Sequence, residues 1–236
     1  MKLGDRIKFY EKQPLPERFI PGLPIILRID GKSFHNFCRN LQKPYSVSLM
    51  NLFDKTTQFL VNQTGAVIGY TQSDEITLIL WADKEDNYKT QVYFDGKAQK
   101  LVSVICSLAT YYFNDKLADE VPSKTGCQAL FDCRAFVVPS LWEACNALIW
   151  REQDATRNSI QSAARAHFSH KQCDNKNGSQ LQDLLHSKGV NWNSYPSRFK
   201  RGGFFNKNGP VDIPILTTIS NLPEVLFHNK EIELKK

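Results

Sequence analysis

The chain has 236 residues, six scattered cysteines and a net charge of +6, which suits one large domain that does not depend on disulfides. It lacks any run of about 18 apolar residues, and this excludes a membrane-spanning helix. The first residues, Met1–Arg6, lack the apolar stretch of a secretory signal, so we expect reduced thiols and a cytoplasmic location. The mild positive charge permits RNA or nucleotide polyphosphates as partners without requiring them.

The N-terminal third is predicted to form a helix, a strand, a second helix and a hairpin. A short helix is expected at residues 2–11. Residues 25–29 are apolar and largely β-branched, as in a buried strand. Residues 47–61 carry apolar side chains at helical spacing. Residues 66–81 read as a hairpin, with Ser73-Asp74-Glu75 near its turn.

The rest of the chain continues the alternation of helices and strands. The sequence predicts a polar loop at 84–87, a long helix opening at 94–100, a strand at 128–138, a helix at 140–168 and a short helix around 181–185. Up to the fourth strand, the order is the α+β, ferredoxin-like βαββαβ arrangement that polymerase palms and nucleotide cyclases use.

Two structural regions are expected from this order. Residues 1–139 would form a palm-like catalytic core with an N-terminal lead-in. Residues 140–236 would form a helical and hairpin extension packed on that core, so that the chain is one compact unit. The charged end of the chain, residues 230–236, is expected to be a loose tail.

Two carboxylates are predicted to meet at one edge of the sheet. Asp30 ends the first strand, Asp74 lies in the hairpin turn, and a right-handed crossover places that strand beside the hairpin. Facing carboxylates repel, and Mg²⁺, which prefers oxygen ligands such as these and the Gly31 carbonyl, would relieve the repulsion. Two Mg²⁺ ions could then bridge Asp30 and Asp74 to phosphates. Taken alone, Ser73-Asp74-Glu75 is more typical of an ordinary tight turn than of a metal site.

Two groups of basic residues are candidates for phosphate or RNA binding. Lys97 and Lys100 share one face near a helix N-terminus, where phosphate is favoured, although a solvated helix start is the alternative. Arg198, Lys200 and Arg201 alternate with aromatic residues, a pattern that suits phosphate contacts combined with base stacking. For this second group, a solvated hairpin over residues 195–205 is the alternative.

Five motifs, taken together, resemble the tRNA-histidine guanylyltransferases and their guanylyltransferase-like relatives, the 3′-to-5′ RNA polymerases. They stand in the family's order and at similar spacing, over roughly residues 1–205. The motifs are Asp30–Phe37, Gln42–Pro44, Gln72–Glu75, Phe131–Arg134 and Trp150–Asp154.

The resemblance implies a palm fold, a site and a set of substrates. Asp30 and Asp74 would ligate two Mg²⁺ ions, helped by the Gly31 carbonyl, and Glu75 would be an auxiliary carboxylate. The nucleotide would be held by Asp30, Gly31, Lys32, Ser33, Phe34, His35, Ser73 and Asp74. Lys43 would contact the activating nucleotide or the RNA 5′ phosphate. The family has basic residues at the positions of Lys97 and Lys100, which favours phosphate binding by these two lysines. ATP and GTP or other nucleoside triphosphates would be substrates, and homotetramers are common in the family.

One departure from the family pattern concerns tRNA recognition. Eukaryotic guanylyltransferases carry a His-Ile-Asn-Asn-Leu-Tyr-Asn stretch after the last motif. This chain has Thr156 where the histidine would stand and keeps only Asn158 of the polar pattern, which we take as a tRNA contact. The substituted form resembles the guanylyltransferase-like branch, which repairs 5′-truncated tRNAs by templated addition.

The function that the sequence favours is therefore addition of nucleotides to the 5′ end of tRNA in the 3′-to-5′ direction. It would be Mg²⁺-dependent, with ATP activating the 5′ phosphate. One alternative is a cyclase-like enzyme that acts on free nucleotides, but the basic segments favour an RNA partner. Another is a non-catalytic RNA-binding ferredoxin-like module, which would not need the acidic pair.

Overall fold

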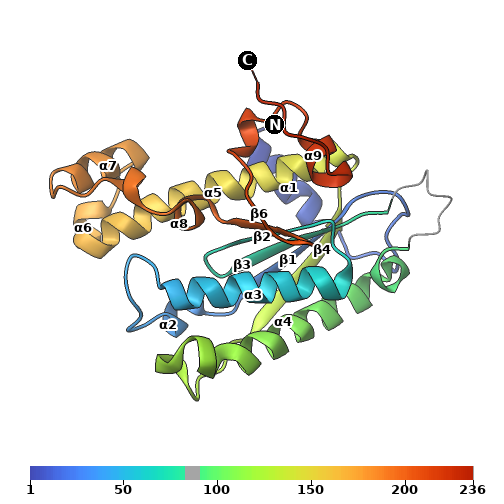
Figure 1. Cartoon of the computed structure of the whole chain (residues 1–236), viewed down its shortest axis with the longest axis horizontal. Helices are drawn as coiled ribbons and strands as arrows, with labels where there is room; N and C mark the ends of the chain where they lie inside the picture. Colours follow the sequence, from blue (N-terminus) through green and yellow to red (C-terminus); the bar gives the residue numbers. More distant parts are fainter. Residues whose placement is uncertain (83–90, 236) are drawn as a thin grey trace.

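The computed structural model describes residues 1–82 and 91–235, so the predicted loop at 84–87 lies outside the described residues. Its centre is a six-stranded antiparallel sheet in the order β4-β1-β3-β2-β5-β6 (Figure 1). The strands are β1 (Ile25–Gly31), β2 (Ile68–Gln72), β3 (Glu75–Leu80), β4 (Phe131–Val137), β5 (Gly203–Asn206) and β6 (Gly209–Val211). The first four strands, with a helix after β1 and another after β3, confirm the predicted βαββαβ order.

Nine α-helices in the described residues surround this sheet. They are α1 (Leu3–Glu11), α2 (Phe34–Phe37), α3 (Val47–Thr64), α4 (Ala98–Glu120), α5 (Leu141–His167), α6 (His170–Cys173), α7 (Gly178–His186), α8 (Ser197–Arg201) and α9 (Leu222–His228). Each helix of this part of the chain is too short or too polar to serve as a transmembrane segment.

Strand alternation gives the sheet two apolar faces. Ile25, Leu27 and Ile29 pack with the buried side chains of α3 and α4, whereas Ile26 belongs to a second core. This second core joins the sheet to Ile7 of α1 and to buried residues of α5 and α9. Figure 1 shows the resulting layers, with α3 and α4 on one side of the sheet and α1, α5 and α9 on the other.

Local signals explain where α3, which packs on the sheet, begins and ends. The Ser46 hydroxyl accepts a hydrogen bond from the Leu49 amide at 3.3 Å, a common N-terminal cap. Gly65 follows the helix with φ +66°, a left-handed conformation that favours glycine and stops the helix. The boundaries of α3 therefore follow from the sequence.

The C-terminal part of the chain differs from its prediction in two ways. The basic segment, for which a solvated hairpin was the alternative, forms α8, and the strand after it, β5, extends the sheet by pairing with β2. The end of the chain, expected to be loose, pairs with the segment before α9: the Lys235 amide donates to the Thr218 carbonyl at 2.7 Å. Residues 206–236 carry no chemical motif, so the sequence alone did not reveal this pairing.

The second half of α5 projects beyond the sheet toward α6 and α7 (Figure 1). There a small third core forms from Ile160, Ala163, Ala164, Cys173, Leu181 and Leu185. This arrangement holds the end of α5 across from α2 and the hairpin of β2 and β3, and so frames the site described next.

Candidate active site

The predicted carboxylates meet at one end of the sheet. Asp30 pairs in register with Glu75 on one side and with Asp132 on the other. The amide of Gly31 donates to the carbonyl of Asp74 at 3.1 Å, which ties the hairpin tip to the end of β1. The topology therefore places Asp30 and Asp74 together, as expected, while their role in metal binding stays a prediction.

The electrostatics of this end of the sheet favour a bound cation. Burial, together with repulsion from Glu75, Asp74 and Asp132, raises the pKa of Asp30 to about 6. Burial also raises the pKa of Asp74, against the opposing hydrogen bond that the Ser73 hydroxyl donates at 3.0 Å. Crowded carboxylate oxygens are the donor set that Mg²⁺ prefers, so the residues present fit this ion.

The side chains at this end of the sheet include two aspartates as candidate cation ligands, Asp30 and Asp74. Among residues 1–82 and 91–235, no group of three or more His, Cys, Asp or Glu side chains is arranged to hold a metal ion. Mg²⁺ is commonly bound through one or two carboxylates plus water and substrate phosphates. The two aspartates therefore suit a cation that arrives with a nucleotide.

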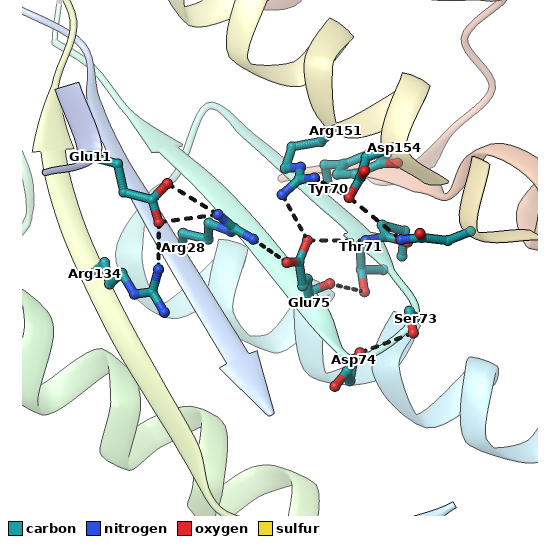
Figure 2. A network of polar contacts seen from close by, with 12 residues as sticks. Glu11, Arg28, Tyr70, Thr71, Ser73, Asp74, Glu75, Arg134, Arg151 and Asp154 are labelled. Atoms are coloured by element: carbon teal, nitrogen blue, oxygen red, sulfur yellow. Dashed lines mark hydrogen bonds and ion pairs between the residues drawn. The ribbon is translucent and has the colours of Figure 1, made fainter. Parts of the chain in front are cut away.

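Glu75, expected as an auxiliary carboxylate, is engaged by two arginines. It forms ion pairs with Arg28 and with Arg151, whose Nη1 lies 3.3 Å from Oε2, and it accepts a hydrogen bond from Gln72 Nε2 at 3.0 Å (Figure 2). The Arg151 side chain is only 4 % exposed. Glu75 thus anchors the hairpin to β1 and α5, and any direct part in catalysis stays a prediction.

Outer partners extend this network on both sides. Glu11 of α1 accepts from Arg28 and from Arg134, and Asp154 of α5 pairs with Arg151 and Arg157 (Figure 2). Sequence analysis missed this role for Arg28 and Arg151. An arginine in the middle of an apolar strand was the available signal, because a buried charge requires a partner.

Gly31 is required for a packing reason. A Cβ at this position would lie 2.2 Å from the Phe34 ring, so the group that approaches the Gly31 backbone closely is Phe34. The Phe34 ring packs against Phe37, Phe53, Phe113 and Phe131. The glycine thus lets Phe34 anchor the segment that follows β1 in the core.

A cleft of about 760 Å³ opens beside the hairpin tip, a volume within the usual range for ligand sites. Its walls are the segment from Phe34 to Ser46, the hairpin tip, the second half of α5 and α8. Of the predicted site residues, the cleft is lined by Phe34, His35, Lys43, Ser73, Asp74, Asn158 and Arg198. Three further basic residues that line it were not predicted: Arg39, Arg165 and His170.

The remaining predicted nucleotide contacts are Asp30, Gly31, Lys32 and Ser33, which directly precede Phe34 in the chain and are not part of the cleft wall. Ser33 has φ +57°, a left-handed backbone that begins α2 and turns the chain toward the cleft. Contact between these residues and a nucleotide stays a prediction.

Lys97 and Lys100 lie away from the cleft. The hairpin returns the chain to the end of the sheet where Leu80 pairs with Ile25, and α4 starts there (Figure 1). Within one chain they therefore cannot contact a phosphate held at Asp30 and Asp74. Binding of phosphate or tRNA by Lys97 and Lys100, at this other end of the sheet, stays a prediction.

The basic residues of α8 are mostly held by protein contacts. Arg201 Nε donates at 3.0 Å to the buried carboxylate of Glu152, and its Nη2 donates to the Ile213 carbonyl. Arg198 pairs with Asp54 at 2.7 Å. Lys200 donates to the Asn193 carbonyl at 2.7 Å. The guanidinium of Arg201 therefore joins α8 to α5, and contact between Arg201 and RNA stays a prediction.

A ferredoxin-like antiparallel sheet that ends in two crowded aspartates beside a basic cleft defines a palm-type nucleotidyltransferase. Comparisons with known proteins agree. The sequence model of a family described as tRNAHis guanylyltransferase matches residues 4–139. The chain belongs to the tRNA-histidine guanylyltransferase family, as its motifs indicated.

Individual relatives match along most of the chain. The tRNA(His) guanylyltransferase of Schizosaccharomyces pombe is 27% identical, over 87% of this chain and 80% of its own. A bacterial guanylyltransferase-like protein solved in complex with ATP superposes with a TM-score of 0.78 and 38% identity, over 92% of this chain and 95% of its own. A bacterial guanylyltransferase-like protein in complex with GTP superposes with a TM-score of 0.70 and 35% identity, over 91% of this chain and 94% of its own.

Proposed function

We propose that the chain adds nucleotides to the 5′ end of tRNA in the 3′-to-5′ direction, using ATP to activate the 5′ phosphate. The observation that carries the proposal is the pair of crowded aspartates, Asp30 and Asp74, of which Asp74 lines a cleft that also contains basic residues. Membership of the family and the ATP and GTP complexes of similar proteins support nucleoside triphosphates as substrates.

The chemistry proceeds in two balanced steps. In the first, a 5′-phosphate oxygen of the RNA attacks the α-phosphorus of ATP, and pyrophosphate leaves. In the second, the 3′ hydroxyl of GTP or another nucleoside triphosphate attacks the activated 5′ phosphorus, AMP leaves, and the hydroxyl proton passes to solvent. The product RNA is one nucleotide longer and carries a 5′ triphosphate.

The named residues have separate tasks in this proposal. Asp30 and Asp74, with the Gly31 carbonyl, would hold two Mg²⁺ ions, which would supply neutralisation of phosphate charge and activation of the attacking and leaving oxygens. His35 and Ser73 position the nucleotide, and Lys43, from the same wall segment as His35, holds phosphate. Glu75 keeps the hairpin tip in place through its arginine partners.

The substrate we propose is a tRNA that has lost its first nucleotide, repaired by templated addition. Family members that act on histidine tRNA carry a histidine where this chain has Thr156. This substitution supports the guanylyltransferase-like branch, which repairs truncated tRNAs. Its hydroxyl donates to the Glu152 carbonyl within the helix rather than projecting as a free recognition group. The proposal further includes a homotetramer that acts in the cytoplasm.

The test uses a 5′-labelled, 5′-monophosphorylated tRNA lacking its first nucleotide, incubated with Mg²⁺, ATP and all four nucleoside triphosphates. Asp74→Asn is the matched control, because it removes the charge and keeps the shape. We expect extension by the wild-type protein that depends on both Mg²⁺ and ATP, and none by the variant.

Two other results would point to the alternatives. RNA binding without extension, equal in both proteins, would indicate a non-catalytic RNA-binding module. Mg²⁺-dependent turnover of free nucleotides without RNA binding would indicate a cyclase-like enzyme.

A further inference from the structure

The cleft has two chemically different ends. Of the residues that line it, Asp74 is the only acidic one, and it lies at the hairpin tip. The basic residues Arg39, Lys43 and Arg165 and the imidazole of His170 line other parts of its wall. Phosphate can be held at the acidic end only with a cation, whereas the basic wall can hold phosphate directly.

The α5 wall of the cleft presents a continuous polar face. Asn158, Ser162 and Arg165 all line the cleft and are spaced four and three residues apart, so they share one face of the helix. Arg165 is exposed. It follows Arg151, which contacts Glu75 beside Asp74, by fourteen residues, which is roughly 20 Å along the helix axis.

Arg165 also differs from the other arginines of α5. Arg151 and Arg157 both pair with Asp154, so their charges are compensated within the protein. In the described part of the chain, Arg165 forms no ion pair. An uncompensated guanidinium on the open rim of a cleft is available to a large anionic ligand that enters from solvent.

The geometry points to Arg165 as a contact for the RNA backbone. This inference rests on the proposed function, in which the 5′ phosphorus must lie beside Asp30 and Asp74, at the end of the cleft that Asp74 lines, to react. If the RNA strand runs from that end along α5, a backbone phosphate several nucleotides from the reacting 5′ end would lie beside Arg165. Arg165 binds this internal phosphate, and its charge acts on the RNA and not on the nucleoside triphosphate.

The test measures tRNA affinity against salt concentration for the full-length protein and two variants. Arg165→Gln keeps most of the side-chain length and removes the charge, and Arg165→Lys retains the charge. We expect Arg165→Gln to weaken tRNA binding roughly fivefold at moderate salt. It should also reduce the slope of log affinity against log salt concentration by about one, while Arg165→Lys keeps the slope.

Lys171→Gln is the charge-matched control, because Lys171 is exposed nearby on α6 and does not line the cleft. It should leave the slope unchanged, and affinity for free GTP should be equal in all four proteins. The inference is overturned if Arg165→Gln keeps the wild-type slope, if Lys171→Gln reduces it equally, or if Arg165→Gln weakens GTP binding as much as tRNA binding.

Failure of this inference can be told apart from failure of the proposed function. A protein whose tRNA binding depends on Arg165 but that extends no RNA would refute the proposed function alone. A protein that extends truncated tRNA while Arg165→Gln shows the wild-type salt slope would refute the inference alone.

Discussion

The backbones of Gly31 and Asp74 are joined by a hydrogen bond of 3.1 Å, from the Gly31 amide to the Asp74 carbonyl. This bond fixes the hairpin tip to the end of β1 and so sets the position of Asp74 relative to Asp30. Because backbone groups make the bond, substitutions of either carboxylate leave it intact. The electrostatic effect of the pair can therefore be measured without disturbing the fold.

The first prediction concerns the pH dependence of stability in metal-free protein. The pKa of Asp30 is about 6 in the folded protein against 3.8 ordinarily, so the folded state holds this proton more tightly. The contribution of the protonated Asp30 carboxyl to folding stability is complete below about pH 4 and is lost as pH rises through about 6. Asp30→Asn should therefore gain unfolding free energy relative to wild type between these values. Urea unfolding in EDTA checks this, and a pH-independent difference would contradict it.

The second prediction separates the roles of two adjacent carboxylates. Glu75→Gln removes the carboxylate that Arg28 and Arg151 share but leaves each arginine its second partner, Glu11 or Asp154, so the unfolding free energy should fall by roughly 1.5 kcal/mol. Asp74→Asn removes a carboxylate that repels Asp30 and should leave stability equal or higher. Urea titrations of both variants test this, and equal stability of Glu75→Gln and wild type would refute the anchoring role.

The third prediction concerns Arg201, whose partner Glu152 is buried. Arg201→Gln should lower the unfolding free energy by roughly 3 kcal/mol, because the Glu152 carboxylate loses its counter-charge. The salt slope of tRNA binding should not change. If the variant were as stable as wild type and bound tRNA with a shallower slope, Arg201 would be an RNA contact after all.

The fourth prediction concerns the aromatic contact that closes one side of the cleft. The rings of Tyr45 and Phe199 stack at 4.5 Å, and they join the segment of residues 38–46 to α8. Tyr45→Ala should lose roughly 1 kcal/mol of stability and expose this segment to protease. Tyr45→Phe keeps the ring and serves as the control. Equal cleavage rates for both variants would show that the stack does not hold the segment.

The core of the fold could be predicted because its strands and helices carry clear local sequence signals. β1 and the hairpin read as apolar strands, and α3 carries its own cap at Ser46 and its stop at Gly65. β5 and β6 escaped detection because they are short and contain glycine, asparagine and proline. β5 pairs with β2, which lies over a hundred residues earlier in the chain, and β6 pairs only with β5 among the described strands.

The site was predictable where topology determines it and not where distant side chains do. Asp30 and Asp74 meet because a crossover sets β1 beside the hairpin. The same topology argument, carried one strand further, places the start of α4 at the far end of the sheet and would have separated Lys97 and Lys100 from the site. The partners of Arg201 and Glu75 could not be read from the sequence, since Glu152 and Arg151 come from a helix far along the chain.

The most direct measurement uses four 5′-monophosphorylated tRNAs that lack their first nucleotide and differ only in the acceptor-strand base opposite the gap. Each is incubated with the protein, Mg²⁺, ATP and all four nucleoside triphosphates, and the added nucleotide is identified. The account predicts that each tRNA receives the complementary nucleotide at its 5′ end. Addition of the same nucleotide to all four would contradict templated repair, and addition to none would contradict 3′-to-5′ nucleotidyl transfer itself.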